Sequence, residues 1–183
     1  MLLSLDISTS CTGWAVFDEN GFRNMGYINL SKHKGLFEKA NRVKTELLRL
    51  VSDHKVSVVA VEENLQAFRP GLSSAKTLMT LAQFNGVVRW ICHSEFKVPV
   101  YSINVNTARK TVGLKINRKS EKSTKEQVLE FVSLVEKNYA WPERDVKRGK
   151  YAGQRRVINE AFDMADAYII GKSFLIEKNK KIN

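Results

Sequence analysis

Cysteine and histidine are scarce in this sequence, and their scarcity excludes two classes of protein. Only Cys11, Cys92 and three histidines occur among 183 residues. Two cysteines are too few for a disulfide-stapled secreted scaffold, and neither they nor the scattered histidines have the spacing of a zinc motif. A chain of this length buries roughly 70% of the surface that its unfolded form exposes, so it needs no such staple.

Long hydrophobic runs are missing as well. No stretch approaches the roughly 18 consecutive apolar residues of a membrane-spanning helix. The first six residues contain no basic segment and place an aspartate inside an apolar stretch, unlike a secretory signal. We therefore expect a soluble, intracellular protein of the cytoplasm with no membrane partner.

Acidic residues are outnumbered by basic ones. Thirty Lys+Arg against nineteen Asp+Glu give a net charge of +11 and a pI near 9.7. This excess is typical of nucleic-acid-binding proteins, although a generally basic soluble surface would give the same total. The basic residues are clustered. Residues 115–125 contain five of them and residues 144–156 contain six, against one acidic residue in each segment. The basic tail, residues 176–183, is expected to be a flexible end.

Hydrophobic periodicity predicts a mixed α/β architecture. Short apolar or alternating runs predict strands over residues 2–8, 13–18, 22–30, 56–61 and 98–103. Apolar residues at three-to-four spacing predict helices over residues 36–54, 73–94, 106–112, 119–135 and 157–175. Short turns join the first three strands into an antiparallel meander, and the nearly continuous apolar run of the fourth is typical of a central parallel strand. We expect one domain over residues 1–183, with a five-stranded mixed sheet flanked by helices.

Two acids stand out because they lie within or at the end of predicted strands, where a lone buried carboxylate is costly. Asp6 follows four residues of an apolar run, where it would serve a site, cap a turn or pair with a buried arginine. Glu62 ends the Val-rich strand, and α/β sheets place ligand sites at the carboxyl ends of parallel strands. Since strand side chains alternate, only one of Glu62 and Glu63 can share a face with Asp6.

Asp163 and Asp166 lie three residues apart in an otherwise apolar helical segment, so both carboxylates project from one face. A solvated outer face would accommodate that pair, and so would a cation. Together with Asp6 and Glu62 they form an oxygen-only set that suits Mg²⁺ or Mn²⁺ rather than zinc. Two divalent ions would balance their charge, and in a two-metal site one ion activates the attacking water while the other stabilises the leaving oxygen.

Several segments carry a family resemblance. They read LLSLDISTSCTGWAVFD, VVAVEENL, VPVYSINVNTARKTVGLK, KEQV and AFDMADAYIIG. In this order, from about residue 2 to residue 170, they resemble the RuvC family of Holliday junction resolvases within the RNase H-like superfamily. The resemblance implies an RNase H-like fold and a metal-dependent endonuclease that resolves four-way and other branched DNA junctions with paired nicks. A small solitary resolvase of this kind suits a viral or phage source.

The resemblance also implies roles for individual residues. Asp6, Glu62, Asp163 and Asp166 would hold the metal ions, and Lys125 would approach the scissile phosphate. The catalytic set is therefore these four acids and one lysine, with Mg²⁺ or Mn²⁺ as the cofactor.

The expected DNA contacts surround this set. A second family lysine falls near Arg109 and Lys110, and the family's aromatic wedge after the catalytic glutamate has no clean equivalent, with Leu65 nearest in a longer loop. The basic segments add phosphate contacts. The predicted DNA-binding residues are Leu65, Phe68, Arg69, Arg109, Lys110, Lys115, Arg118, Lys119, Lys122, Lys147, Arg148, Lys150, Arg155 and Arg156.

A homodimer is the expected assembly. Two opposed cuts in a four-way junction need two active sites related by a two-fold axis, which a C2 dimer supplies. The resemblance places the interface on the helix predicted over residues 73–94. The alternative is that the apolar residues of this helix simply face the core: Leu78, Leu81, Val88 and Ile91. Both interpretations can hold, because such a helix has two faces.

Three other functions fit part of the pattern. An RNase H-type enzyme or a general flap and branch nuclease would share the same motifs. The first motif also resembles the phosphate motif of actin-like ATPases and sugar kinases, but those proteins need two such domains and a later Gly-rich loop. A catalytically silent binding module would not need to retain all four acids.

Overall fold

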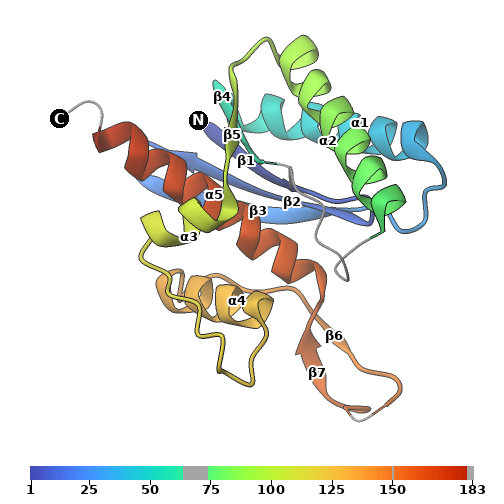
Figure 1. Ribbon diagram of the computed structural model, residues 1–183, viewed down its shortest axis with the longest axis vertical. Helices are drawn as coiled ribbons and strands as arrows, with labels where there is room; N and C mark the ends of the chain where they lie inside the picture. Colours follow the sequence, from blue (N-terminus) through green and yellow to red (C-terminus); the bar gives the residue numbers. More distant parts are fainter. Residues whose placement is uncertain (64–73, 150, 181–183) are drawn as a thin grey trace.

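The structure, a computed structural model, describes residues 1–63, 74–149 and 151–180. Five strands form the main sheet (Figure 1): β1 Leu2–Ile7, β2 Cys11–Asp18, β3 Gly21–Asn29, β4 Val58–Glu62 and β5 Val100–Ile103. The helices are α1 Leu36–His54, α2 Ala75–Phe96, α3 Val105–Thr111, α4 Thr124–Val135 and α5 Glu160–Lys180. A separate hairpin pairs β6 Glu143–Asp145 with β7 Arg155–Val157.

The strand order of the main sheet is β3-β2-β1-β4-β5. The pairs β3–β2 and β2–β1 are antiparallel, whereas β1–β4 and β4–β5 are parallel. The predicted combination of a three-stranded meander with parallel strands is thereby confirmed.

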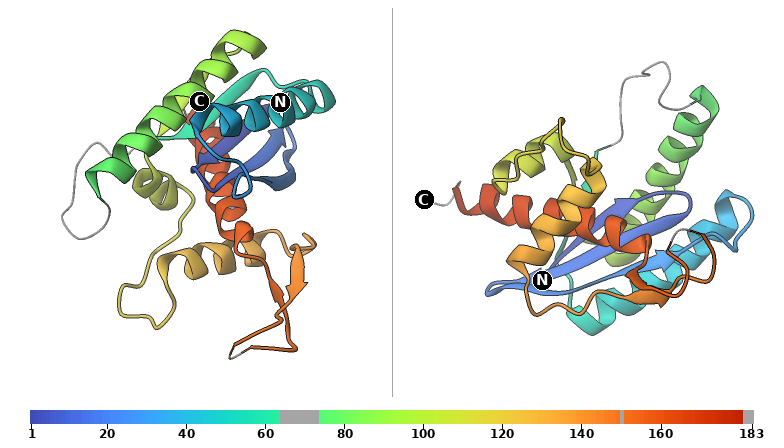
Figure 2. Two further views of the ribbon diagram at one scale, coloured as in Figure 1. Left: turned by 90° about the vertical axis from the view of Figure 1, so that its right-hand side faces the viewer. Right: turned by 90° about the horizontal axis from the view of Figure 1, so that it is seen from below.

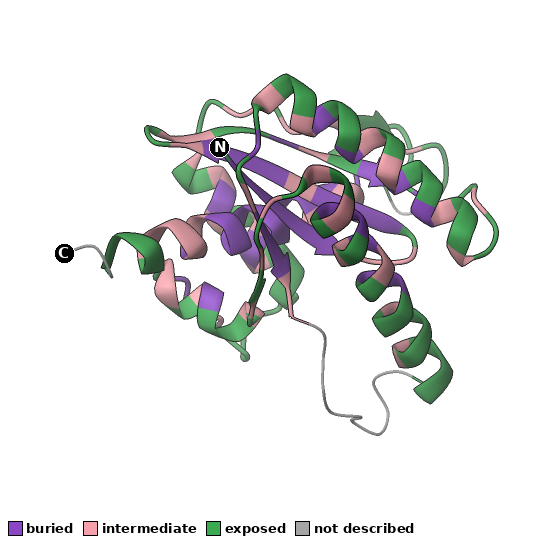
Figure 3. Cartoon of the chain, turned by 90° about the horizontal axis from the view of Figure 1, so that it is seen from above, coloured by how far each residue is buried: buried purple, intermediate pink, exposed green. Residues whose placement is uncertain are grey.

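Helices cover both faces of the sheet. In Figure 1, α1 and α2 lie on one side, while α5 crosses the other side with α3 and α4 outside it. Alternate residues of β1 divide between two hydrophobic cores, because Leu3 and Leu5 pack under α1 and α2 whereas Leu2 packs with α5. Figure 3 shows the resulting buried layer along the strands, between helices whose outer faces are exposed.

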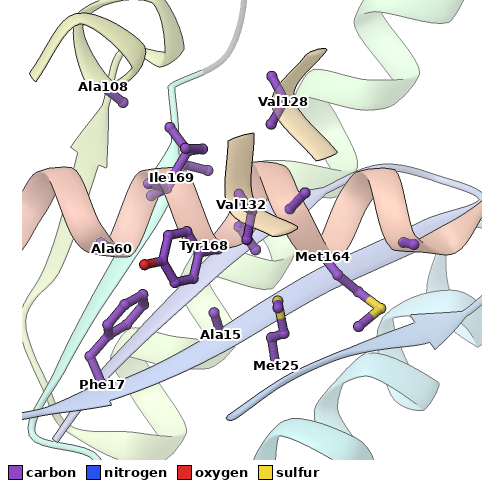
Figure 4. Packing of buried hydrophobic residues seen from close by; sticks show 14 of the residues in the cluster. Ala15, Phe17, Met25, Ala60, Ala108, Val128, Val132, Met164, Tyr168 and Ile169 are labelled. Carbon is purple, nitrogen blue, oxygen red and sulfur yellow. The ribbon is translucent and has the colours of Figure 1, made fainter. Parts of the chain in front are cut away.

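Helix α5 is the central element of the second core. Its residues Ala161 and Met164–Gly171 are buried, as expected for a helix that is apolar on nearly all sides. Tyr168 packs against Phe17 of β2 with ring centroids 5.4 Å apart (Figure 4). A helix buried to this extent holds its few polar side chains in fixed positions.

Among the differences from the sequence-based expectation, three concern α4, α5 and the basic segment that precedes α5. Helix α4 begins at Thr124 rather than at residue 119, because Ser123 and Glu126 form a capping box that fixes its start. Helix α5 begins at Glu160 and continues to Lys180, so residues 176–180 are helical where a flexible tail was predicted. The basic segment expected to be a loop contains the β6–β7 hairpin.

None of the helices formed by the described residues has the length and apolarity that crossing a bilayer demands.

Candidate active site

Two of the predicted acids are brought together by strand register. Leu5 of β1 is aligned with Val61 of β4 in a parallel pair, so the next residues, Asp6 and Glu62, are neighbours. Both point to the α5 side, the face shared by Leu2 and Ala60. Glu63 turns away and accepts a hydrogen bond from Asn104 Nδ2 at 3.3 Å. The register therefore places Glu62, rather than Glu63, beside Asp6.

Small side chains on the sheet let α5 approach closely enough to complete the site. Gly13 of β2 is aligned with Asp6, and a Cβ atom there would lie 2.0 Å from the backbone oxygen of Asp163. The Ser4 hydroxyl donates a hydrogen bond of 2.7 Å to the carbonyl of Ala167. The helix backbone thus rests directly on the sheet beside Asp6.

The first turns of α5 supply the other two acids. Asp6, Glu62, Asp163 and Asp166 all line one cleft, together with Lys125 and Arg109. Lys125 Nζ lies 3.1 Å from Asp163 Oδ1, and Arg109 Nη2 lies 3.1 Å from Asp166 Oδ1. The cleft therefore gathers the four predicted carboxylates and two cations from five elements.

Burial and neighbouring negative charge make Asp6 and Asp166 hard to ionise. Burial raises the pKa of Asp6 well above its usual range, and Glu62 and then the two aspartates of α5 raise it further. Burial also raises the pKa of Asp166, although Arg109 partly opposes that shift. The two basic side chains offset only half of the charge of four ionised acids, so the cleft favours additional positive charge.

Lys125 keeps its proton in this setting. Burial lowers the pKa of its ammonium group, but the charges of Asp163, Asp166 and Asp6 outweigh that effect and leave the pKa raised. Its position, exposed yet in contact with Asp163, allows it to meet an anion that enters the cleft from solvent.

The donor set fits a hard divalent cation. All four acids offer oxygen ligands, which suit Mg²⁺ or Mn²⁺. Burial raises the pKa of the nearby Cys11 thiol, which favours its protonated form over a thiolate ligand. Within residues 1–63, 74–149 and 151–180, no three acidic, histidine or cysteine side chains are already drawn together as a metal cage. Lys125 and Arg109 hold the aspartates of α5, and cation binding would require some rearrangement of these side chains.

The remaining predicted DNA contacts fall into three groups. Leu65, Phe68, Arg69 and Lys150 lie outside the described residues. Five exposed basic residues follow one another from the end of α3 to the start of α4: Lys110, Lys115, Arg118, Lys119 and Lys122. The third group is exposed on the hairpin segment: Lys147, Arg148, Arg155 and Arg156.

The structure adds one acid that the sequence analysis missed. Glu160 lines the same cleft, accepts a hydrogen bond of 2.9 Å from Asn29 Nδ2, and has a buried Oε2 without a hydrogen-bond partner among the described residues. Its signal was available, because Glu160 precedes Asp163 by three residues and so shares its helix face.

Arg109 also has a role beyond the one predicted. The sequence analysis assigned it to DNA, whereas in the structure it forms an ion pair with Asp166.

Comparisons with known proteins identify the fold through structure alone. No protein-family model matches the chain, and no curated protein matches its sequence.

Solved structures do match over almost the whole chain. Thermus thermophilus RuvC in complex with a Holliday junction substrate has a TM-score of 0.66 at 16% identity, with 98% of this chain and 94% of that chain covered. A second T. thermophilus RuvC structure gives 0.62 at 17% identity, covering 98% and 96%. The yeast mitochondrial Holliday junction resolvase Ydc2 gives 0.57 at 16% identity, covering 98% and 79%. The chain therefore has the fold of the RuvC resolvases, which confirms the predicted RNase H-like fold.

Proposed function

We propose that this protein is a metal-dependent endonuclease that resolves four-way DNA junctions. The observation that carries the proposal is the cleft in which Asp6, Glu62, Asp163 and Asp166 converge beside Lys125, within a fold shared with known resolvases. The excess of basic residues supplies the attraction that a DNA substrate requires.

The four carboxylates would hold Mg²⁺ or Mn²⁺, two ions in each active site. When bound, such ions make an attacking water more acidic and stabilise negative charge on the phosphate and the leaving oxygen. Asp6 and Glu62 present their oxygens from adjacent strands, and this rigid support fixes one side of the site. Asp163 and Asp166 close the other side from α5.

The two basic side chains have different tasks. Lys125, with 56% of its side chain exposed, would contact the scissile phosphate and offset its charge. Arg109, with only 16% of its side chain exposed, lies deeper and would orient Asp166 instead. Nothing in either role needs a proton transfer from the side chain, since both remain charged.

A comparison of substrates tests the proposal. With Mg²⁺ or Mn²⁺, the protein should cut a synthetic four-way junction much faster than a flap, an RNA–DNA hybrid or a linear duplex, and EDTA should stop all cutting. Preferential cleavage of the hybrid would favour an RNase H-type enzyme, and equal cleavage of flaps a general branch nuclease. Absence of metal-dependent cleavage of any of these substrates would refute the proposal.

The homodimer is part of the same proposal. Helix α2 turns Val88 and Ile91 to the core, and its opposite face exposes Met79 and Trp90 at 64% each. Phe37 of α1 is 77% exposed and lines the same apolar hollow as Trp90. Large exposed apolar side chains in one place are typical of protein–protein interfaces.

Trp90→Glu should therefore convert a dimer into a monomer. A buried tryptophan at the centre of an interface is worth roughly 2 kcal/mol or more, which weakens association at least about 30-fold. Sedimentation at micromolar concentration measures the change, and the monomer should nick one strand without the paired second cut. Leu134→Glu, at a 66% exposed site on α4, is the matched control and should leave the mass unchanged. A wild-type monomer that still makes paired nicks would contradict the dimer.

A further inference from the structure

The β6–β7 hairpin stands apart from the main sheet. Figure 2 shows it projecting from the body of the molecule beyond α4, and within the described residues its two strands pair only with each other. Towards its tip, the backbone amide of Val146 donates a hydrogen bond of 2.9 Å to the backbone carbonyl of Gln154. Gly149 and Gly153 take positive φ values of 85° and 83°, which the tight turns of the tip require.

The two faces of the hairpin differ in charge balance. On one face Arg155 Nε lies 2.9 Å from Glu143 Oε2, and Asp145 is aligned with Arg155. The other face carries Arg144 and Arg156, which are aligned directly across the two strands. Both are exposed, and within the described part of the chain neither forms an ion pair. Like charges directly opposite each other destabilise a hairpin, so this pair costs stability unless an anion lies between them.

Arg156 is also held in place. Its guanidinium carbon lies 3.9 Å from the centre of the Tyr151 ring, in a cation–π contact that limits its rotamers. Arginine in such a fixed position is suited to phosphate, because its planar fork donates two parallel hydrogen bonds to phosphate oxygens.

Both arginines line a groove between the hairpin and α4, and the ion pair of Arg155 with Glu143 lines it as well. The acids of this groove are largely engaged. Glu143 pairs with Arg155, Glu130 accepts from Lys122 Nζ at 2.8 Å, and Glu126 accepts from the Ser123 backbone at 2.7 Å. The hydrogen bonds from Ser123 lower the pKa of the Glu126 carboxyl, and the charge of Arg156 adds to that effect.

The groove adjoins the carboxylate cleft. Asn159 and Phe162 line both cavities, so an extended ligand can occupy one and continue into the other. This continuity favours the same ligand, a nucleic-acid backbone, in both places.

We infer that Arg144 and Arg156 form a clamp for a backbone phosphate of the DNA substrate, outside the scissile position and on the arm that leaves the cleft past α4. The inference rests on the proposed function and specifies which basic residues of the hairpin contact the substrate. Arg155 was also assigned to DNA from the sequence, but in the structure its guanidinium is engaged by Glu143 and has Asp145 beside it, so it does not belong to the clamp.

Adjacent arginines on opposite faces provide a matched test. Arg156→Gln and Arg155→Gln remove the same charge one residue apart, and Arg144→Gln/Arg156→Gln removes the whole clamp. Affinity for a synthetic four-way DNA junction is measured in EDTA between 50 and 200 mM salt. The slope of log affinity against log salt is negative, and each lost phosphate contact makes it less steep by about 0.9. Over this range the wild-type protein should lose affinity roughly 3.5-fold more than the double variant, which has lost the one phosphate contact, and Arg156→Gln should lie between the two. Arg155→Gln should follow the wild type.

A hydroxyl-radical footprint supplies the second readout. The double variant should lose protection of backbone positions flanking the cut and keep protection at the cut itself. Circular dichroism checks that the exposed hairpin variants remain folded. Equal slopes for Arg156→Gln and Arg155→Gln, or an unchanged footprint of the double variant, would overturn the clamp. A wild-type protein that neither binds nor cuts the junction would instead reject the proposed function.

Discussion

Asp6→Asn should abolish junction cleavage, preserve DNA binding and make the metal-free protein more stable. Loss of one ligand oxygen from a two-metal site removes several kcal/mol of transition-state stabilisation, which is roughly a 10³-fold decrease in rate. Binding should persist or tighten, because the basic surface is intact and one negative charge has left the cleft. Cleavage under single-turnover conditions and affinity for the same junction measure the two effects.

The gain in stability has a predicted pH dependence. Burial and the neighbouring acids raise the pKa of Asp6 in the folded protein, so the folded state holds this proton more tightly than the unfolded state. The free energy of unfolding of the wild type therefore falls as the pH rises from the usual aspartate range through the raised pKa. Asparagine cannot ionise, so the difference in melting temperature between Asp6→Asn and wild type should grow with pH in EDTA.

An exposed aspartate provides the control. Asp53 lies on the surface near the end of α1. Substitution of such a residue, as in Asp53→Asn, changes the free energy of unfolding by no more than about 0.5 kcal/mol. This variant should cut at the wild-type rate and melt at the wild-type temperature. Undiminished cleavage by Asp6→Asn would end the four-carboxylate proposal, whereas a loss of DNA binding would show that the variant is misfolded or that Asp6 has another role.

Sequence reasoning reached the sheet and the candidate acids because both leave local signals. The strands have short apolar or alternating runs, and an acid within such a run, like Asp6, is conspicuous. Parity within β4 showed that only one of Glu62 and Glu63 can face Asp6, and the family resemblance then favoured Glu62. Those inferences need only the nearest residues in the chain, and the periodicity of a strand or helix encodes them.

Contacts between distant segments left no such signal. The pair Arg109–Asp166 joins residues 57 positions apart, and it depends on how α3 packs against α5. The hairpin strands, ERD and RRV, are short and charged, and they bury almost no apolar surface that would reveal them. The start of α4 was different in kind, because the Ser123–Glu126 capping box is legible in the sequence and would have corrected the boundary.

Gly13→Ala should damage both the fold and the site, although Gly13 is neither a ligand nor in an unusual conformation. Its added methyl group would lie 2.0 Å from the oxygen and 2.3 Å from the carbon of the Asp163 carbonyl. These are backbone atoms of a buried helix, so no side-chain rotation relieves the clash, and α5 must move away from β2. Overpacking of this severity costs roughly 3 kcal/mol, equivalent to a decrease of about 6–12 °C in melting temperature for a chain of this size.

The same displacement separates Asp163 and Asp166 from Asp6 and Glu62. A misplacement of about 1 Å is enough to slow catalysis roughly 100-fold, so cleavage by Gly13→Ala should be impaired even at temperatures where the variant is folded. Gly86→Ala adds the same methyl group within α2 and meets nothing within 4 Å; in a helix interior it should be neutral or stabilise by up to about 1 kcal/mol. Thermal melts of the two variants separate a steric effect at the helix–sheet contact from a general intolerance of glycine replacement. The cleavage rate of Gly13→Ala is compared with that of the wild type, because Gly86 lines the apolar hollow beside Trp90. If Gly13→Ala melted and cut like the wild type, α5 could not rest on β2 at this point, and the convergence of the four acids would lose its structural basis.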